Sequence, residues 1–583
     1  MTSNTRPPKR TDRPENLSKS NLGWVSDVAA EMLRRLNIDY ISLVPGASYR
    51  GLHDSIVNYL GNEKPQIVLT ITEQAAVGIA QGYAKVSGKP MAVALHANIG
   101  LMHGLVNVFD AYCDRVPMVI VGATGPVDAA KRRPWIDWVH TSKDQGALIR
   151  NFSKWDDQPA SAEALVESFL RAAQISQTAP MGPVYVCLDA ELQEKRLERP
   201  PDLPDVKRYA APIPPGPDQR SLDRAVELVL KARNPVILAG RVSRDDNDWS
   251  RRVKFAEALG APVYTAIKLA TAFPTNHELH AGTLSLFPDG AALEALEGAD
   301  LAISLDWPDL RSTLTAAGHK KSSIKVINAS MDQTLHNGWN MDYLGIPPVD
   351  LAIPCDPDAF VGAVVGRVAA TNLVKREYAK IRRVPKLSVT ETNPITVSAM
   401  AKCVKEAMTG QSVSYLGFAY GWPIEFFPFE DPLGYLGADA GGVVGAGPSF
   451  AVGAALALLG SGKIPVMITG DGDFLSGMTA LWTAARMKIP LLFIIKNNRS
   501  FFNDEMHQER VAQTRGRPTV NRWIGQRLDD PPPDLAALAL AQGIDGVGPI
   551  TDVEDLANAL DRGISSVKEG EPFVIDVVVE ERK

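Results

Sequence analysis

The stretch IPVMITGDGDFLSGMTALWTAARMKIPLLFIIKNN, residues 464–498, decides the fold. Its apolar runs Ile464–Thr469 and Leu491–Lys496 predict two buried strands. The segment Ser476–Met487 between them predicts a helix. A strand, a helix and a second strand in this order are typical of a parallel sheet that is covered by helices.

Polar residues follow both strands, at the carboxyl ends where open α/β sheets bind their ligands. Gly470 and Gly472 would let the backbone approach a ligand closely and adopt unusual dihedral angles. Asp471 and the amide oxygen of Asn498 are hard ligands that suit magnesium or calcium, and a helix N-terminus suits phosphate. A tight turn without a ligand also uses Gly and Asp, but Asn498 one strand later favours a site for a metal ion and a diphosphate.

The rest of the chain alternates short apolar runs with helical periods in the same way. Such runs indicate parallel sheets with helices on both faces. The predicted fold class is therefore α/β, with three doubly wound parallel-sheet domains. Further strands are predicted at Tyr40–Val44, Gln66–Ile71, Met91–Leu95, Pro117–Gly122, Val184–Leu188, Pro235–Ala239, Pro262–Ala266, Leu301–Leu305, Lys325–Ile327, Ser412–Leu416 and Phe573–Val579.

A proline-rich stretch at 196–217 and a charged stretch at 374–394 separate three blocks of sequence. Proline has no backbone N–H, so the first stretch does not fit inside a sheet. The first 20 residues are polar and rich in Pro, Lys and Arg, which is typical of a disordered arm. We therefore expect an arm at 1–20, followed by three domains at 21–195, 218–373 and 390–583.

Composition and charge argue against several classes of protein. The 583 residues carry a net charge of −6, so no basic surface argues for nucleic acid. The four cysteines are far apart and form no CxxC pair, which argues against a zinc site and fits a cytoplasmic protein. The longest apolar stretch, Phe450–Leu459, is about half of the roughly 20 residues that span a bilayer. Residues 1–20 lack the apolar core of a secretory signal, and we expect no membrane partner.

The segment Gly470–Asn498 resembles the thiamine-diphosphate motif, in which GDG is followed by NN. The resemblance implies an enzyme that uses thiamine diphosphate and Mg²⁺. It implies that the metal is held by Asp471, the side chain of Asn498 and the main-chain carbonyl of Ser500. It also implies contacts to the cofactor from Gly470, Gly472, Asp473 and Asn498.

The segment Ile71–His96 resembles the pyrimidine-binding domain of the same family, with Gly82-Tyr83-Ala84 and Gly88-Lys89-Pro90 in register. Taken alone, Glu73 is an acidic residue at a helix N-terminus, where it is favourable without any ligand. The resemblance implies that Glu73 bonds pyrimidine N1′ and favours the imino tautomer, so that N4′ takes the C2 proton. A carboxyl in this role needs an apolar site that raises its pKa.

In this family an apolar side chain wedges the bent cofactor, and the segment 441–447 matches that position. The register assigns the wedge to Val444, with Gly442 also at the cofactor. Valine is smaller than the Leu, Ile or Met that is usual there. The family likeness also implies that each active site is shared between two subunits. Glu73 would then act across the interface of a homodimer at least, and commonly of a homotetramer.

Three positions bear on the substrate. Pro45–Ser48 matches the turn that carries a catalytic Ser in benzoylformate decarboxylase, although this chain has Ala47 at that point and Ser48 one residue later. His96 matches an active-site His of the same enzyme, and a structural His at a strand end is the alternative. His277 matches a His that is common in the family. We expect His96 and His277 to be catalytic together with the activating glutamate.

The middle block resembles the domain that binds FAD in acetolactate synthases, but Leu305–Arg311 departs from the usual GARFDDR-like pattern, so the sequence does not favour FAD.

Residues 499–527 predict either a solvated basic loop or a mobile lid with aromatic and cationic contacts to an anionic substrate. Four aromatic side chains would extend the apolar wall of the site: Trp135, Trp138, Phe418 and Trp422.

These features predict a lyase or carboligase that acts on a small 2-oxo acid or acyloin. The pattern is closest to the branch of acetolactate synthase and benzoylformate decarboxylase. An acyloin or 2-hydroxyacyl-CoA lyase and a non-catalytic relative of the fold are the alternatives. A nicotinamide dehydrogenase is a weaker one, because no clean GxGxxG with a downstream acidic residue is present.

Overall fold

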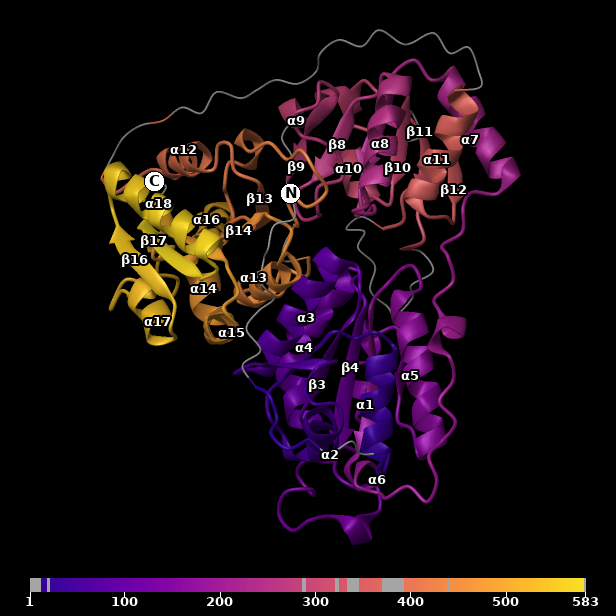
Figure 1. Cartoon of the computed structure of the whole chain (residues 1–583). Coiled ribbons are helices and arrows are strands. Elements are labelled where there is room, and N and C mark those ends of the chain that lie inside the picture. The colour runs from indigo at the N-terminus through magenta and orange to yellow at the C-terminus, as the bar shows by residue number, and fades with distance from the viewer. Residues whose placement is uncertain are drawn as a thin grey trace.

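The computed structural model of the chain describes residues 12–17, 21–285, 290–319, 324–332, 345–369, 389, 393–437 and 440–580. Its strands form three sheets, two of six strands and one of five, with parallel pairing. Figure 1 shows three layered bodies, the N-terminal one in indigo and purple below the central and C-terminal ones. The predicted α/β fold class is confirmed. Most of the predicted arm at 1–20 and of the predicted linker at 374–394 lies outside the described residues.

The N-terminal sheet has the strand order β2-β1-β3-β4-β6-β5. Helices α1 and α5 pack on one face and α3 and α4 on the other. The elements are α1 (Val25–Arg35), β1 (Tyr40–Leu43), α2 (Arg50–Asp54), β2 (Gln66–Leu69), α3 (Glu73–Ser87), β3 (Met91–Leu95), α4 (Ala97–Cys113), β4 (Met118–Thr124), β5 (Asp156–Asp157), α5 (Ala162–Gln177), β6 (Pro183–Asp189) and α6 (Ala190–Gln193).

The central sheet has the order β12-β11-β10-β7-β8-β9. Helices α7, α8 and α11 cover one face, and α9 and α10 the other. The elements are α7 (Gln219–Lys231), β7 (Pro235–Ala239), α8 (Asp246–Leu259), β8 (Val263–Ala266), β9 (His280–Leu284), α9 (Gly290–Glu297), β10 (Leu301–Leu305), α10 (Leu310–Ala316), β11 (Lys325–Ala329), β12 (Leu351–Ile353) and α11 (Pro357–Ala369).

The C-terminal sheet has the order β13-β14-β15-β17-β16. Helices α12 and α18 cover one face, and α13, α15 and α17 the other. The elements are α12 (Val397–Ala407), β13 (Val413–Gly417), α13 (Ala446–Ala457), β14 (Ile464–Gly470), α14 (Asp471–Gly477), α15 (Ala480–Met487), β15 (Leu492–Asn497), α16 (Phe502–Thr514), α17 (Leu535–Ala541), β16 (Asp545–Ile550), α18 (Val553–Glu569) and β17 (Phe573–Val578).

Every strand predicted from the sequence is present, and four strands were missed: β5, β9, β12 and β16. All four are edge strands. An edge strand is less enclosed than a central one and lacks the continuous apolar run that identified the others. The helix predicted over Ser476–Met487 is wrong at its start, because α14 begins at Asp471 and α15 follows after a break at Met478 and Thr479.

Helices α3 and α13 join the N-terminal and C-terminal bodies through one continuous hydrophobic core. Their backbones approach closely where both helices carry glycine. A Cβ on Gly82 would lie 1.9 Å from the carbonyl oxygen of Phe450, and a Cβ on Gly453 would lie 1.9 Å from that of Ile79. In Figure 1, α13 lies directly above α3 and α4.

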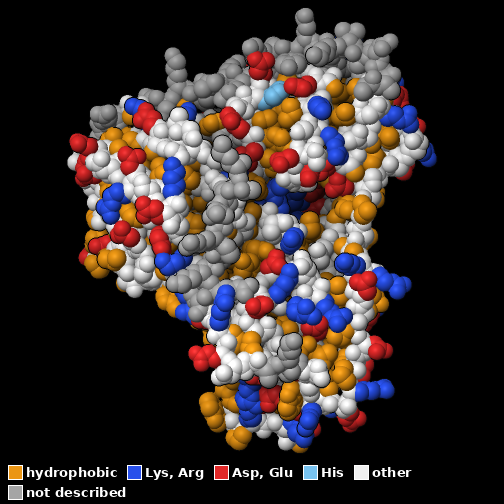
Figure 2. Space-filling view, viewed as in Figure 1, with side chains coloured by type: hydrophobic (Ala, Val, Ile, Leu, Met, Phe, Trp, Pro, Cys, Tyr) orange, Lys and Arg blue, Asp and Glu red, His pale blue; other side chains and the backbone are white. Residues whose placement is uncertain are grey.

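Charged side chains lie together where the N-terminal and central bodies meet, and Figure 2 shows basic and acidic groups side by side in the hollow there. Lys85 on α3 pairs with Asp114, and their side chains are only 5% and 1% exposed. Arg115 donates to Asp332 at 2.7 Å across the two bodies. The Arg115–Asp332 pair therefore joins the two bodies, whereas Lys85–Asp114 lies within the N-terminal one. The four cysteines are buried and form no disulfide bond. None of the described helices is long and apolar enough to cross a membrane.

Candidate functional site

The predicted metal ligands lie at the carboxyl ends of the neighbouring strands β14 and β15. Asp471 begins α14, and Asn498 and Ser500 follow β15. The Ser500 N–H donates to Asp471 Oδ2 at 3.0 Å and to Asn498 Oδ1 at 3.2 Å. Two side-chain oxygens therefore converge on one N–H group. The structure brings these three residues together, and we call them the metal half of the site.

The metal half fits a magnesium ion. Asp471 is 4% exposed, and burial raises its pKa to about 6, so a cation bound here would stabilise the ionised carboxylate. A Cβ on Gly470 would meet no atom within 4 Å, which leaves space beside Asp471. Within the described parts of the chain, no group of three or more His, Cys, Asp or Glu could hold a metal. A cation at Asp471 would be bound by one carboxylate and by uncharged oxygen atoms. Such a set of ligands suits Mg²⁺ that is bound together with phosphate.

The two glycines of the motif do not have the unusual dihedral angles that the sequence predicted. Gly470 has φ −79° and ψ 159°, which any residue adopts. Gly472 lies inside α14, where a Cβ would be 2.5 Å from the ring of Phe501. Gly472 is therefore required by close packing, and that part of the prediction is wrong.

Asp473 holds the segment that presents Val444. Its Oδ1 accepts the N–H of Gly445 at 2.7 Å, and its Oδ2 accepts the hydroxyl of Thr469 at 2.6 Å. Gly445 and Gly442 have φ of +90° and +72°, which only glycine adopts readily. The resulting turn leaves the side chain of Val444 58% exposed. Asp473 thus contacts the protein through both oxygens and fixes the turn between the two glycines.

Glu73 begins α3 in the N-terminal body, with Thr72 as the N-cap. Its Oε2 lies 2.8 Å from Nδ1 of His103 on α4. A Cβ on Gly100 would lie 3.0 Å from Glu73 Oε1 and 3.3 Å from Cβ of His96, so both side chains contact the same glycine. The imidazole of His103 is therefore a hydrogen-bond partner of Glu73. No local pattern identified His103, which lies 30 residues from Glu73.

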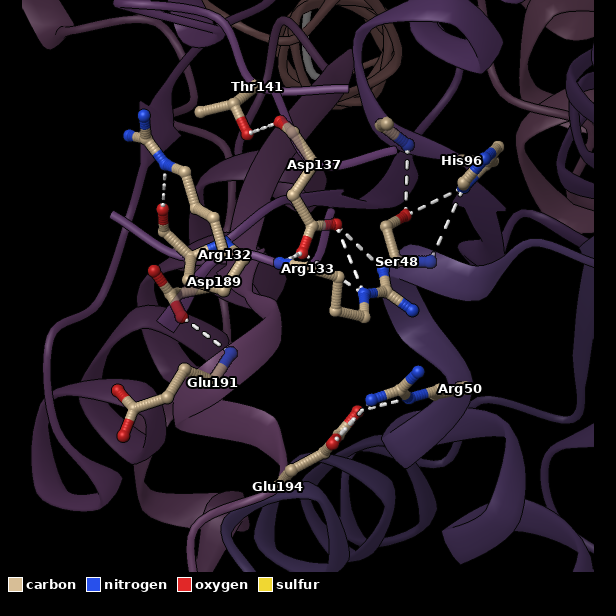
Figure 3. A network of polar contacts seen from close by, with 12 residues as sticks. Ser48, Arg50, His96, Arg132, Arg133, Asp137, Thr141, Asp189, Glu191 and Glu194 are labelled. Carbon is tan, nitrogen blue, oxygen red and sulfur yellow. Dashed lines mark hydrogen bonds and ion pairs between the residues drawn. The ribbon is translucent and has the colours of Figure 1, made fainter. Parts of the chain in front are cut away.

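His96 is the N-cap residue of α4 and lies close to Glu73. Its Nδ1 is 2.9 Å from the hydroxyl of Ser48, and Figure 3 shows that hydroxyl pointing toward the ring. The ring of His140 stands at 89° to that of His96, with centroids 4.7 Å apart. Burial lowers the pKa of His96 first, and His140 lowers it further. We call Glu73, His96, His103 and His140 the glutamate half of the site.

His277 lies in the central body, between β8 and β9, and the structure does not join it to the glutamate half. Its Nε2 is 3.3 Å from Oε1 of Glu257 on α8, and its Nδ1 accepts the N–H of Leu279 at 3.1 Å. Its ring packs edge-on against Phe273. These contacts fix the turn before β9, and they are those of a structural histidine.

The four aromatic residues expected to form an apolar wall have different surroundings. Phe418 and Trp422 stack at 6.1 Å, and Trp422 is only 4% exposed. They belong to the core of the C-terminal body. Trp135 and Trp138 are 75% and 70% exposed on the loop after β4.

Residues 499–527 include helix α16, and the segment is joined to the metal half although most of its side chains are exposed. The hydroxyl of Ser500 donates to Glu505 at 2.6 Å, and Glu505 is 1% exposed. Arg522 and Arg527 lie 3.3 Å and 3.5 Å from the same carboxylate. Glu505, which the sequence analysis did not single out, therefore ties α16 and the following turns to Ser500.

Comparison with known proteins covers all three bodies. The family model described as thiamine pyrophosphate enzyme, N-terminal TPP binding domain, matches residues 23–148. The corresponding central-domain model matches residues 222–363, and the C-terminal TPP binding domain model matches residues 416–577.

Among individual proteins, the chain is 25% identical to benzoylformate decarboxylase of Pseudomonas aeruginosa, covering 88% of this chain and 91% of that protein. It is 23% identical to a probable acetolactate synthase large subunit of Methanocaldococcus jannaschii, covering 88% and 85%. Its fold is similar to the crystal structure of benzoylformate decarboxylase from Polynucleobacter necessarius, with a TM-score of 0.80 and 21% identity over 96% of this chain and 99% of that one.

Proposed function

Because the chain belongs to the thiamine pyrophosphate enzyme family, we propose that it is a lyase or carboligase that acts on a 2-oxo acid with thiamine diphosphate and Mg²⁺. The observation that carries the proposal is the convergence of Asp471 Oδ2 and Asn498 Oδ1 on the Ser500 N–H. That geometry supports one cation bound at the ends of two parallel strands. Curated relatives named as benzoylformate decarboxylase and acetolactate synthase support the reaction class.

The metal half would hold Mg²⁺ through Asp471, the amide oxygen of Asn498 and the carbonyl of Ser500. The space beside Gly470 and the N–H groups of α14 suit the diphosphate. Asp473 keeps the glycine turn in place, and the exposed side chain of Val444 would contact the cofactor there. When bound, thiamine diphosphate supplies an electron sink next to the carbonyl carbon.

In the glutamate half, Glu73 would bond the pyrimidine ring and set its tautomer. His96 is a candidate to hold or move a proton at the substrate, since it lies beside Glu73 through the shared contact with Gly100. The contacts of His277 favour a structural role, and we do not carry it into the proposed chemistry.

The two halves are proposed to meet between subunits. Ile99, Met102 and Val106 are 44%, 50% and 44% exposed and recur at helical spacing on α4, beside His103. An apolar stripe on one helix face of an otherwise buried element is typical of a protein–protein interface. We propose a homodimer in which this face packs on the C-terminal body of the partner, and a homotetramer as its assembly. We further propose that the protein is cytoplasmic and that its three domains span 21–195, 218–373 and 390–583. We do not propose FAD as a cofactor.

The test is a screen of 2-oxo acids (pyruvate, benzoylformate, and branched and aromatic analogues) that measures carbon dioxide release with and without thiamine diphosphate and Mg²⁺. We expect release that needs both additions and is lost in Glu73→Gln. Calorimetry on the same variant is expected to show that Mg²⁺ still binds, because Glu73 lies outside the metal half. A protein that binds no thiamine diphosphate in the presence of Mg²⁺ would refute the proposal.

A further inference from the structure

The turn Gly46–Ser48 forms a support for the ring of His96. A Cβ on Gly46 would lie 2.5 Å from Cγ of His96, so the ring rests directly on that backbone. Ser48 is 3% exposed, and its hydroxyl lies 2.9 Å from His96 Nδ1. The next residue, Ala97, has φ +47°, a strained value for a residue other than glycine. The backbone around His96 is therefore held in one unusual conformation.

The hydrogen-bond partners of Ser48 determine which nitrogen of His96 carries a proton. The Ala97 N–H donates to Ser48 Oγ at 3.1 Å, so the oxygen accepts there. The Ser48 backbone N–H points at His96 Nδ1 at 3.4 Å, and an N–H group only donates. Nδ1 therefore faces donors and presents its lone pair, and the serine hydroxyl donates to it as well. The ring proton of the neutral imidazole lies on Nε2.

The groups around His96 favour the neutral ring on balance. Burial disfavours the charged form most and lowers the pKa of His96. His140 and Arg133, in the loop after β4, lower it further, whereas Glu73 on α3 raises it. Tyr49, next to Ser48, packs edge-on at 6.4 Å and carries no charge, because burial raises its phenol pKa. Among the described residues, His96 Nε2 has no hydrogen-bond partner, which leaves its proton available to a ligand.

We propose that Ser48 is a positioning residue that keeps His96 neutral with its proton on Nε2, so that His96 donates a hydrogen bond to a substrate oxygen. The inference rests on the proposed function for the identity of the substrate as a 2-oxo acid, whose carbonyl and carboxylate oxygens are acceptors. The protonation state of the His96 ring follows from the structure alone. Ser48 acts through His96, so one experiment tests the state of the ring and a second tests its effect on turnover.

The first readout is the nitrogen NMR signal of His96 in the full-length protein without cofactor, labelled with ¹⁵N-histidine and assigned by its loss in His96→Asn. We expect an unprotonated Nδ1 and a protonated Nε2 in the wild-type protein. Ser48→Ala is expected to mix the two tautomers and raise the titration midpoint of His96 by about one pH unit. Ser48→Thr keeps the hydroxyl and is expected to behave as wild type. Ser48→Gly, which also lacks the hydroxyl, replaces the alanine variant if that one does not fold.

The second readout is turnover of the 2-oxo acid found in the screen. We expect Ser48→Ala to lower kcat about tenfold or more with little change in KM, and Ser48→Thr to restore it. A wild-type ring with its proton on Nδ1, or a tautomer unchanged in Ser48→Ala, overturns the inference whatever the activity. A tautomer that changes as expected in a protein that turns over no 2-oxo acid supports the role of Ser48 and counts against the proposed function alone.

Discussion

The crossing of α3 and α13 gives the most specific prediction, because a single distance shows whether the crossing has room for a larger side chain. In Gly82→Ala the new Cβ would lie 1.9 Å from the carbonyl oxygen of Phe450, whereas real contacts of this kind essentially never fall below 3.0 Å. The helices must therefore separate by at least 1.1 Å at the crossing. The neighbour is backbone, so no side-chain rotation can relieve the contact.

The expected cost follows from two opposing effects. Overpacking of a well-packed core costs about 1–3 kcal/mol, and a backbone contact belongs at the upper end. Replacing glycine by alanine inside a helix stabilises the folded protein by about 0.5–1 kcal/mol. We expect a net loss of roughly 2 kcal/mol, which lowers the melting temperature by roughly 5 °C for a body of this size.

The assay is differential scanning calorimetry on the full-length protein, with Gly366→Ala as the matched control. Gly366 lies inside α11, and a Cβ there would meet no atom within 4 Å. The control is therefore expected to melt at or slightly above the wild-type temperature. If Gly82→Ala melted as high as Gly366→Ala, the close crossing of α3 and α13 would be refuted.

Three further predictions concern the metal, the buried charges and the interface. Burial raises the pKa of Asp471 to about 6, and a metal binds only its ionised form, so Mg²⁺ affinity by calorimetry should fall about tenfold for each pH unit below pH 6 and level off above it. Asp114→Ala leaves the buried ammonium of Lys85 unpaired and should cost about 3–5 kcal/mol in chemical unfolding; an unchanged midpoint would contradict the pairing. Met102→Lys should dissociate the proposed dimer in analytical ultracentrifugation, whereas Leu230→Lys, on an exposed position of α7, should not.

The sequence predicted the interior of the fold better than its margins. Central strands such as β3 and β14 are buried on both faces, so their apolar runs stand out without any knowledge of their neighbours. Edge strands such as β5 and β16 depend on one neighbour for their pairing, and the residues Asp156–Asp157 carry no apolar signal at all. Their pairing arises only once the sheet exists.

The sequence likewise predicted some residues of the candidate site and missed others. Asp471 and Asn498 follow strands that are adjacent in the sheet, so their spacing along the chain already implied their convergence. His103 and His140 reach the glutamate half from a helix face and a loop end, and neither lies in a motif that fixes its place. The state of the His96 ring depends on the backbone of Ser48, which pattern alone does not specify.

The shared core of α3 and α13 has a consequence for synthesis of the chain. Helix α3 ends at residue 87 and its partner begins at residue 446. At roughly 5–20 residues per second, the ribosome needs on the order of a minute or less to make the intervening segment. During that interval the face of α3 that packs against α13, with Gly78 and Gly82, is uncovered. That surface stays uncovered until α13, in the last quarter of the chain, has been made.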